Sequence, residues 1–525
     1  MTTTTNRIRS ICPHTKQVLR EFDCADQAGV NQVVASAARR FQTSRLDLNA
    51  RLRLISKLRT LIADNADEIA QLISSEVGKP LSECYSCEIA GVLDTCVWLN
   101  SNARRLLAPE RIGLANPLAL LKKCYVHHEP LGVIGVISPW NFPFSIPMTT
   151  VLQAVAAGNT VVLKPSEKST LVGLKIAELF LQAGFPEGTV NVLVGDGQTG
   201  KFLSEHPQLS RLILTGSVRA GQRIVEQTAR NLTPVTLELG GKDAAIVLPD
   251  APVKYTARGL VWGAFTNAGQ ACASVERVYI VDGANTRALI DEIVKQTKQL
   301  RVGAPASLAD LETGTPNDVG PIIDEAQLNK IAAQVEDARR NGASVLCGGR
   351  VLSDLPGYFY APTVLTGVNH GMAVMREETF GPVIAIMVVQ SVVEALRLAN
   401  DSDFGLTASV WSASVRDAQK LAPHLQVGTV YVNDCIFSHA APELPWGGVK
   451  HSGIGRSHSH IGLMDMVNIK NINLDTARGA GRLWWYPYGA GHAKLFQGGI
   501  QAMHGSSLSA RVRGAVQMVT HFFKK

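Results

Sequence analysis

A single cysteine, Cys272, lies at the centre of a run of small residues, in the segment GAFTNAGQACASVERV that spans residues 263–278. Small neighbours leave room for a substrate carbon to come within bonding distance of the sulfur. The thiolate is the reactive form, so a nucleophile here needs either a lowered pKa or a base beside it. An inert core cysteine would have the same neighbours, because free cysteines are among the most buried residues. Other motifs must decide between the two.

Two further motifs carry polar side chains that could assist such a nucleophile. In Ser138-Pro-Trp-Asn-Phe-Pro143, two prolines stiffen a loop and hold Asn141 in a fixed direction. A rigid amide can donate a hydrogen bond to an oxygen that becomes negative during a reaction. Glu238 stands beside two glycines in LELGGK (237–242), where a carboxylate can swing and act as a general base. Alone, Asn141 could equally close a turn and Glu238 could be a surface residue.

Two glycine-rich turns are candidates for holding nucleotide phosphates. Gly195-Asp-Gly-Gln-Thr-Gly200 matches the G-x-G-x-x-G pattern, but residues 214–222 contain no acidic residue that would hold the ribose. We interpret it as an ordinary strand-to-helix turn. Thr215-Gly216-Ser217, followed by Gly221, also opens a helix, so its backbone N–H groups and hydroxyl could face an anion. Ser217 as a simple helix N-cap explains the same residues equally well.

The elements that must position these residues follow from the hydrophobic pattern. Residues 8–22 predict two short strands around a turn, and helical periodicity follows in the ranges 27–44, 50–76 and 80–105. Short apolar runs then predict strands at 133–137, 160–163, 190–194, 211–214 and 234–239, separated by helices at 147–157, 168–183, 198–204 and 219–230. This alternation predicts a parallel sheet covered on both faces. A second block of the same kind, from about 243 to 440, gives an α/β fold with two lobes.

Composition and charge restrict the class of protein. A chain of 525 residues is too long for one core, so two or three domains are expected. Nine cysteines at irregular spacings disfavour a disulfide framework and favour a reducing compartment. The net charge is +7, and all of the excess lies in residues 476–525, which hold seven Lys and Arg and no acidic residue. The remainder is neutral, which gives no reason to expect a nucleic-acid partner.

Two histidine pairs, His127-His128 and His458-Ser-His460, lack carboxylate or cysteine partners at ligand spacing, so no metal site is expected. The first residues, MTTTTNRIRS, lack the apolar run of a signal peptide, and no apolar stretch is long enough to cross a bilayer. A cytoplasmic location is therefore expected.

Seven motifs taken together resemble the aldehyde dehydrogenase superfamily. They are PWNFP (139–143), KPSE (164–167), TGS (215–217), LELGGK (237–242), NAGQAC (267–272), EETFGP (377–382) and PWGGVKHSGIGR (445–456). The resemblance covers nearly all of residues 8–474. It implies a Rossmann-like NAD-binding domain (1–111 and 131–242), an α/β catalytic domain (243–456) and a small β oligomerisation arm (112–130 and 457–474). The arm implies a homodimer or homotetramer.

The resemblance also implies a role for each candidate residue. Cys272 would attack the aldehyde carbon, Asn141 would hold the oxyanion, and Glu238 would activate the water that hydrolyses the thioester. The cofactor contacts would be Trp140, Lys164, Glu167, Gly216, Ser217, Gly221, Glu378 and Phe380. A carboxylate at position 167 accepts hydrogen bonds from a ribose 2′-OH but repels a 2′-phosphate, so NAD is favoured over NADP.

Residues 475–525 extend beyond the superfamily pattern. Leu483-Trp-Trp-Tyr-Pro-Tyr488 is a dense aromatic cluster, similar to that of relatives which handle apolar aldehydes. Leu508, Val512, Ala515, Val519 and Phe522 recur at helical spacing and predict an amphipathic helix with basic residues nearby. Such a helix could lie in a membrane interface, in which case the protein would be peripherally membrane-associated. It could instead cover the substrate entrance or pack on a partner subunit.

The sequence therefore predicts an NAD-dependent dehydrogenase that oxidises a hydrophobic aldehyde to its acid. Two alternatives stay open at this point. One is a semialdehyde dehydrogenase, which would need a cationic anchor for the substrate carboxylate. The other is a catalytically idle structural or binding homologue, against which the intact set of Cys272, Glu238 and Asn141 argues.

Overall fold

The computed structural model describes residues 6–43, 46–116, 119, 121–314, 316–476 and 482–522. They form two compact units. The first contains the chain up to Ala108 and His128–Ile469, and the second contains Pro109–His127 and the chain from Lys470 onward. Among the residues described, no helix is long and apolar enough to cross a bilayer.

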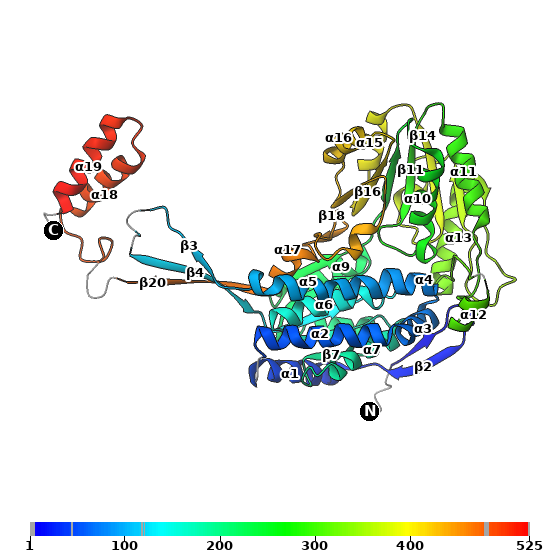
Figure 1. Cartoon of the computed structure of the whole chain (residues 1–525), viewed down its shortest axis with the longest axis horizontal. Coiled ribbons are helices and arrows are strands. Elements are labelled where there is room, and N and C mark those ends of the chain that lie inside the picture. The colour runs from blue at the N-terminus through cyan, green and yellow to red at the C-terminus, as the bar shows by residue number, and fades with distance from the viewer. Residues whose placement is uncertain are drawn as a thin grey trace. The chain divides into compact units, whose positions relative to one another are not determined.

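The first unit contains a six-stranded sheet in the order β19-β9-β8-β5-β6-β7 (Figure 1). Its strands are β5 (Val133–Ile137), β6 (Thr160–Lys164), β7 (Val190–Val192), β8 (Leu209–Thr215), β9 (Val235–Glu238) and β19 (Gly453–Ile454). All pair in parallel except β19, which runs antiparallel to β9. The intervening helices are α6 (Ser145–Ala157), α7 (Thr170–Gln182), α8 (Gly197–Ser204) and α9 (Val218–Ala229). The alternation predicted from the sequence is confirmed.

The register of this sheet brings the candidate motifs to one edge. Ile137 of β5 lies opposite Lys164 of β6 and Leu214 of β8, and Thr215 lies opposite Glu238 of β9. Parallel strands that end level with one another deliver their following loops to the same place. The PWNFP, KPSE, TGS and LELGGK motifs therefore meet at the carboxyl edge of the sheet.

Helices from the N-terminal part of the chain cover this sheet (Figure 1). After the hairpin β1 (Arg7–Ile11) and β2 (Val18–Asp23) come α1 (Gln27–Thr43), α2 (Leu48–Asp64), α3 (Ala66–Val77), α4 (Leu81–Glu83) and α5 (Ala90–Leu106). The structure differs from the sequence prediction in two places. The helix expected at 50–76 breaks at Asn65, whose side chain and backbone N–H both bond the Leu61 carbonyl. The helix expected at 80–105 contains a π-helical turn at Cys84–Ile89.

A second sheet of seven strands has the order β12-β13-β14-β11-β10-β16-β17. Its strands are β10 (Asp243–Val247), β11 (Val275–Val281), β12 (Ser344–Cys347), β13 (Thr363–Thr366), β14 (Val383–Val389), β16 (Thr407–Trp411) and β17 (Thr429–Val432). Only β12 pairs antiparallel. The helices of this lobe are α10 (Val253–Phe265), α11 (Thr286–Gln299), α12 (Leu308–Thr313), α13 (Glu325–Arg340), α14 (Ala373–Arg376), α15 (Val392–Asn400) and α16 (Val415–Leu421). The two-lobed α/β fold is confirmed.

Short elements complete the first unit: β15 (Phe404–Gly405), β18 (Val449–Lys450) and α17 (Ser459–Met464). The second unit contains the three-stranded sheet β20-β4-β3, formed by β20 (Val467–Asp475), β4 (Lys122–Pro130) and β3 (Glu110–Ile112). It also contains α18 (His492–His504) and α19 (Leu508–Phe522), which lie side by side as a helical hairpin (Figure 1). The hairpin closes tightly because a Cβ on Gly514 would lie 2.4 Å from the Ala502 nitrogen.

Candidate active site

The three residues assigned to the chemistry line one cavity of 210 Å³ in the first unit. Asn141 comes from the loop after β5, Glu238 from the end of β9, and Cys272 from the turn before β11. The cavity is lined by Pro139, Trp140, Asn141, Ile146, Thr215, Gly216, Ser217, Glu238, Leu239, Gly240, Cys272, Gln327, Lys330, Glu378 and Phe380. A thiol, an amide and a carboxylate, far apart in sequence, therefore face a common space.

A strained turn presents Cys272 to this cavity. The preceding residues Asn267 and Ala268 have φ values of 51° and 55°, in the left-handed region that non-glycine residues seldom adopt. Glu83 holds the turn, because its carboxylate accepts hydrogen bonds from the Asn267 backbone N–H (2.8 Å) and from Thr266 Oγ1 (3.1 Å). Gly241 of the LELGGK motif packs against the nucleophile segment, where a Cβ would lie 2.3 Å from the Cys272 carbonyl oxygen.

Burial raises the pKa of the Cys272 thiol well above its usual range, and the nearby carboxyl groups of Asp243, Glu378 and Glu238 raise it further. The sequence required either a lowered pKa or a base beside the sulfur. The structure shows no lowered pKa, and it places the Glu238 carboxyl group in the same cavity as the sulfur. Cys272 therefore rests as a thiol, and its proton must be removed before it can attack.

A buried ion pair fixes the loop that carries Asn141. Lys79 Nζ donates to the Asn141 carbonyl at 2.8 Å and to Glu88 Oε1 at 2.5 Å, and both charged side chains are fully buried. The other Glu88 oxygen accepts from the backbone N–H groups of Phe144 (3.2 Å) and Ser145 (2.8 Å). Glu88 reaches these groups from the π-helical turn, a feature that often marks functional sites.

The Asn141 side chain is directed by a single protein contact that the structure records. Its Nδ2 donates to the Gln270 carbonyl at 3.0 Å. A side-chain amide carries two N–H donors. Asn141 therefore brings a second N–H donor to the cavity that Cys272 also lines.

Glu238 is buried and held on one side only. Ser457 Oγ donates to Glu238 Oε1 at 3.1 Å, whereas Oε2 has no hydrogen-bond partner within the described part of the chain. Burial raises the pKa of Glu238 to about 8, although Ser457 and Arg456 lower it. A carboxylate with one anchored and one unoccupied oxygen, and a pKa near neutral, suits a general base.

Ser457 was not predicted from the sequence, because it directly follows the last recognised motif. Its oxygen also lies 3.1 Å from His458 Nδ1. Burial lowers the pKa of His458 to about 3. His458 is thus a neutral imidazole in contact with Ser457.

Glu378 and Phe380 lie in the loop between α14 and β14. A second buried ion pair holds this loop. Lys242 Nζ pairs with Glu276, whose carboxylate accepts from the backbone N–H groups of Thr379 (2.9 Å) and Phe380 (3.0 Å). Glu378 Oε1 accepts from the Gly241 N–H at 3.1 Å. These bonds place Glu378 and Phe380 in the same cavity as Cys272.

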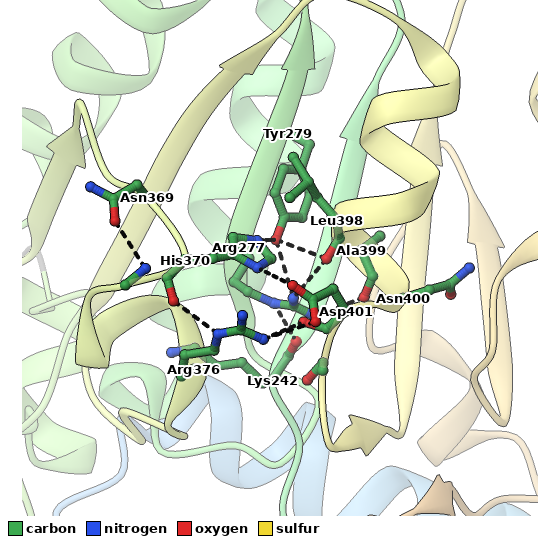
Figure 2. Close-up of polar contacts among 12 residues, drawn as sticks. Lys242, Arg277, Tyr279, Asn369, His370, Arg376, Leu398, Ala399, Asn400 and Asp401 are labelled. Carbon is green, nitrogen blue, oxygen red and sulfur yellow. Dashed lines mark hydrogen bonds and ion pairs between the residues drawn. The ribbon is translucent and has the colours of Figure 1, made fainter.

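A buried arginine ties the LELGGK motif to the second lobe (Figure 2). Arg277 Nε donates to the Lys242 carbonyl at 2.9 Å, and its Nη2 donates to the Ala399 carbonyl at 3.1 Å. Arg277 also donates to the Tyr279 hydroxyl, which lies 2.8 Å from His370 Nε2. This network fixes the end of the segment that bears Glu238 and the two glycines.

A second cavity of 870 Å³ adjoins the first through shared lining residues. Both are lined by Pro139, Trp140, Thr215, Gly216 and Ser217. The second also contains Lys164 and Glu167. Ser217 caps the N-terminus of α9, where its Oγ accepts from the Ala220 N–H at 3.3 Å. A helix N-terminus beside a cationic and an anionic side chain fits a dinucleotide, with pyrophosphate at the helix and ribose at the carboxylate.

The structure adds to the predictions made for two glycine-rich turns. Gly221 lies outside this cavity: its Cα is buried, and a Cβ there would lie 2.7 Å from Leu239 Cδ1. The missing Cβ allows α9 to pack closely on Leu239, and a contact between Gly221 and the cofactor stays a prediction. Conversely, Gly197 and Gly200 of the turn set aside above do line the second cavity, together with Asp196. Sequence spacing alone could not show that this turn borders the same space as Ser217.

Comparison with known proteins identifies the class that this fold and site define. The aldehyde dehydrogenase family matches residues 1–472. A 4,4'-diapolycopene aldehyde oxidase of Methylomonas sp is 35% identical over 503 residues, covering 95% of this chain and 91% of that protein. A putative succinate-semialdehyde dehydrogenase [NADP(+)] of Mycolicibacterium smegmatis is 37% identical over 445 residues, covering 83% of each.

Solved structures indicate the same family as the sequence comparisons. The NAD-dependent aldehyde dehydrogenase from Sinorhizobium meliloti superposes with a TM-score of 0.85 at 34% identity, covering 92% of this chain and 93% of that one. The chain belongs to the aldehyde dehydrogenase family and is an oxidoreductase that uses a nicotinamide cofactor. The match to the Methylomonas protein covers a larger share of the chain than residues 1–475 make up, so it extends into the C-terminal tail.

Proposed function

We propose that this protein oxidises an apolar aldehyde to its carboxylic acid with NAD, through a thioester on Cys272. The observation that carries the proposal is the single cavity shared by Asn141, Glu238 and Cys272, which joins a second cavity with dinucleotide-binding features. When bound, NAD supplies the hydride acceptor, and the protein supplies the nucleophile, the oxyanion donors and the base.

The chemistry proceeds in two halves. Glu238 accepts the thiol proton, and Cys272 Sγ forms a bond to the aldehyde carbon, whose oxygen becomes an oxyanion held by Asn141 Nδ2 and the Cys272 N–H. The carbon then loses hydride, the oxyanion reforms a carbonyl, and a thioester results. Glu238 then releases the thiol proton to solvent. In the second half Glu238 takes a proton from water, the hydroxide attacks the thioester, and the Cys272 sulfur leaves as a thiolate that recovers this proton from Glu238. Aldehyde, NAD and water thus yield acid, NADH and a proton.

The preference for NAD rests on Glu167. Its carboxylate shares the second cavity with Lys164 and can accept hydrogen bonds from the two hydroxyls of a ribose. A 2′-phosphate at the same point would meet a like charge. Burial lowers the pKa of Lys164, and its Nζ already donates to the Pro165 carbonyl at 3.0 Å, so it is a weaker counter-ion for that phosphate than an exposed lysine would be.

The preference for an apolar aldehyde rests on the surroundings of Cys272. One apolar cluster joins Phe142, Ile146 and Ala271, and another joins Ala273, Leu406 and Trp446 with the Cys272 side chain. A carboxylated aldehyde needs a cation near its far end. Of the described residues that line the Cys272 cavity, only Lys330 is basic. It shares that lining with Gln327 and with Glu378 and Phe380, the expected cofactor contacts. The Methylomonas relative, named for an apolar aldehyde, supports this choice.

A substrate panel and a pre-steady-state experiment test the proposal together. Stopped-flow mixing with aldehyde and NAD should give a burst of NADH in the native protein and none in Cys272→Ala. The kcat/KM for long aliphatic or polyene aldehydes should exceed that for short carboxylated ones. Normal turnover by Cys272→Ala would refute the mechanism. A higher kcat/KM for succinate semialdehyde would overturn the substrate class and favour the semialdehyde alternative.

We also propose that the sheet β20-β4-β3 is a contact between subunits of a homodimer or homotetramer. The strand β20 is solvent-exposed along most of its length and includes Ile469 and Leu474, which are exposed large apolar side chains. A small sheet with apolar residues in solvent is marginal alone and is stabilised by a partner. Analytical ultracentrifugation should show a dimer or tetramer, and a monomer at micromolar concentration would refute this assignment.

A further inference from the structure

The helix α19 carries a row of apolar side chains that remain in solvent. Leu508, Val512, Val516, Val519 and Phe522 follow one another at intervals of three and four residues, so they lie on one side of the helix. Their exposed fractions range from 48% for Phe522 to 79% for Leu508. The opposite side of α19 is used against α18, where Gly514 is buried. Contiguous apolar surface of this kind marks an interaction site.

The row is continuous with an apolar groove on the helical hairpin. A groove of 520 Å³ is lined by Leu483, Leu495, Phe496, Gly499, Ile500, Met503, Met518, Val519 and Phe522. None of these side chains carries a charge. Val519 and Phe522 belong both to the groove and to the exposed row, so the two form one apolar surface within the second unit.

Aromatic residues with polar tips precede the hairpin. Trp484, Trp485, Tyr486 and Tyr488 are all exposed, and Tyr486 reaches 84%. Trp and Tyr with their rings in solvent are unusual on a free surface, but they are enriched at the boundary between lipid and water, where an apolar ring and a polar tip are both satisfied.

The charge of the segment decides which partner fits. Residues 476–525 contain seven basic residues and no acidic one, whereas residues 1–475 are neutral overall. Of the basic residues, Arg478, Lys524 and Lys525 lie outside the described part of the chain. Two copies of this segment would repel one another, so pairing hairpin to hairpin is disfavoured. An anionic surface, in contrast, would attract it.

We propose that the aromatic segment 484–488 and the hairpin α18–α19 form an interfacial anchor that binds the surface of an anionic lipid bilayer. The apolar row and groove enter the boundary of the acyl chains, the aromatic rings lie at the headgroups, and Lys494 and Arg513 contact lipid phosphates. The anchor lies along the membrane and does not span it. The proposal concerns binding alone, so its test does not depend on the catalytic assignment.

Co-sedimentation of the full-length protein with vesicles tests the anchor. The protein should pellet with vesicles of equal parts phosphatidylcholine and phosphatidylglycerol, and much less with phosphatidylcholine alone or in high salt. V512N together with V516N removes apolar contact and should weaken binding on the order of tenfold. K494Q together with R513Q should weaken it about 25-fold, since each basic residue contributes roughly fivefold at an anionic surface.

A matched variant controls for nonspecific effects. Leu232 and Val393 are exposed by 87% and 77% in the first unit, so L232N with V393N removes the same kind of side chain away from the anchor. This variant should pellet like the native protein, and the thermal midpoint followed by circular dichroism verifies that each variant is folded. The proposal is overturned if the native protein fails to pellet with anionic vesicles, or if V512N/V516N pellets equally well. It is also overturned if that variant changes only the oligomeric mass, because the row would then be a subunit contact.

Discussion

Replacing Ser457 by alanine should change how Glu238 responds to pH without altering any reacting atom. Ser457 Oγ donates the hydrogen bond that the structure records at the buried carboxylate, at 3.1 Å from Oε1, and it lowers the pKa of a group that burial raises to about 8. A hydrogen bond to a charged group contributes about 1.5–3 kcal/mol. Since a pKa unit corresponds to about 1.4 kcal/mol, the pKa of Glu238 in S457A should rise by about one to two units.

The direction of the shift in the pH profile follows from the protonation state in which Glu238 acts. Glu238 works as a base only when ionised, so the hydrolysis step is fast above its pKa and slow below it. In S457A the rising limb of the kcat profile should therefore move from about pH 8 to about pH 9–10. Below pH 8 the steady-state rate and the rate of the NADH burst should both fall about tenfold, because Glu238 is the base in both halves of the reaction.

Stopped-flow NADH formation across the range on both sides of pH 8 measures both phases in one experiment. S457T restores a hydroxyl and should return the limb toward its native position. S459A is a matched control, because the Ser459 hydroxyl is buried nearby but accepts from the Ile461 N–H at 3.2 Å. The reasoning is refuted if the kcat limb of S457A coincides with that of the native protein, or if S459A moves it equally.

Three further substitutions follow from the site. Glu238→Gln should raise stability: between pH 4.5 and about 8 the native carboxyl keeps a proton that the unfolded chain has lost, so stability falls by about 1.4 kcal/mol per pH unit, and the substitution removes this loss. Its thermal midpoint should exceed that of the native protein at pH 8 but not at pH 4.5, and equal midpoints at pH 8 would contradict the raised pKa. Glu167→Ala should increase kcat/KM for NADP about tenfold or more relative to NAD, because a like charge near the 2′-phosphate is removed; an unchanged ratio in cofactor titrations would show that Glu167 does not face the ribose. Gly241→Ala should lower kcat by at least about a hundredfold, because its Cβ would meet the Cys272 carbonyl oxygen at 2.3 Å, whereas Gly113→Ala, with nothing within 4 Å, should not; comparable kcat values for the two would exclude the contact.

The layers of the fold were predicted well from the sequence, because the periodicity of apolar residues indicates directly which residues are buried. The strands β5 to β9 and the helices between them lie within about two residues of their expected positions, since each strand is a short, mainly apolar run bounded by turn residues. The π-helical turn at Cys84–Ile89 was not predicted, because its residues fit a helical period equally well and only Glu88's contacts with the Phe144 and Ser145 backbone distinguish it.

Site residues could be predicted where they belong to a recognisable motif. They could not be predicted where only the packing of distant segments brings them to the site. Cys272, Asn141 and Glu238 were found as reactive types in restricted loops, and the structure places them in one cavity. Ser457 was missed because a serine has no pattern that points to a carboxylate 219 positions earlier in the chain. For Gly221 the structure shows a close contact with Leu239, and the sequence cannot distinguish a glycine required by such packing from one that faces a phosphate.

The raised pKa of Cys272 has a consequence for how the protein survives oxidants. Peroxides attack the thiolate and not the thiol, and they convert it stepwise to sulfenic, sulfinic and sulfonic acids. A sulfur kept protonated by burial and by three neighbouring carboxyl groups is a poor target for them. The arrangement that makes Cys272 depend on Glu238 for its reactivity therefore also preserves the enzyme between turnovers.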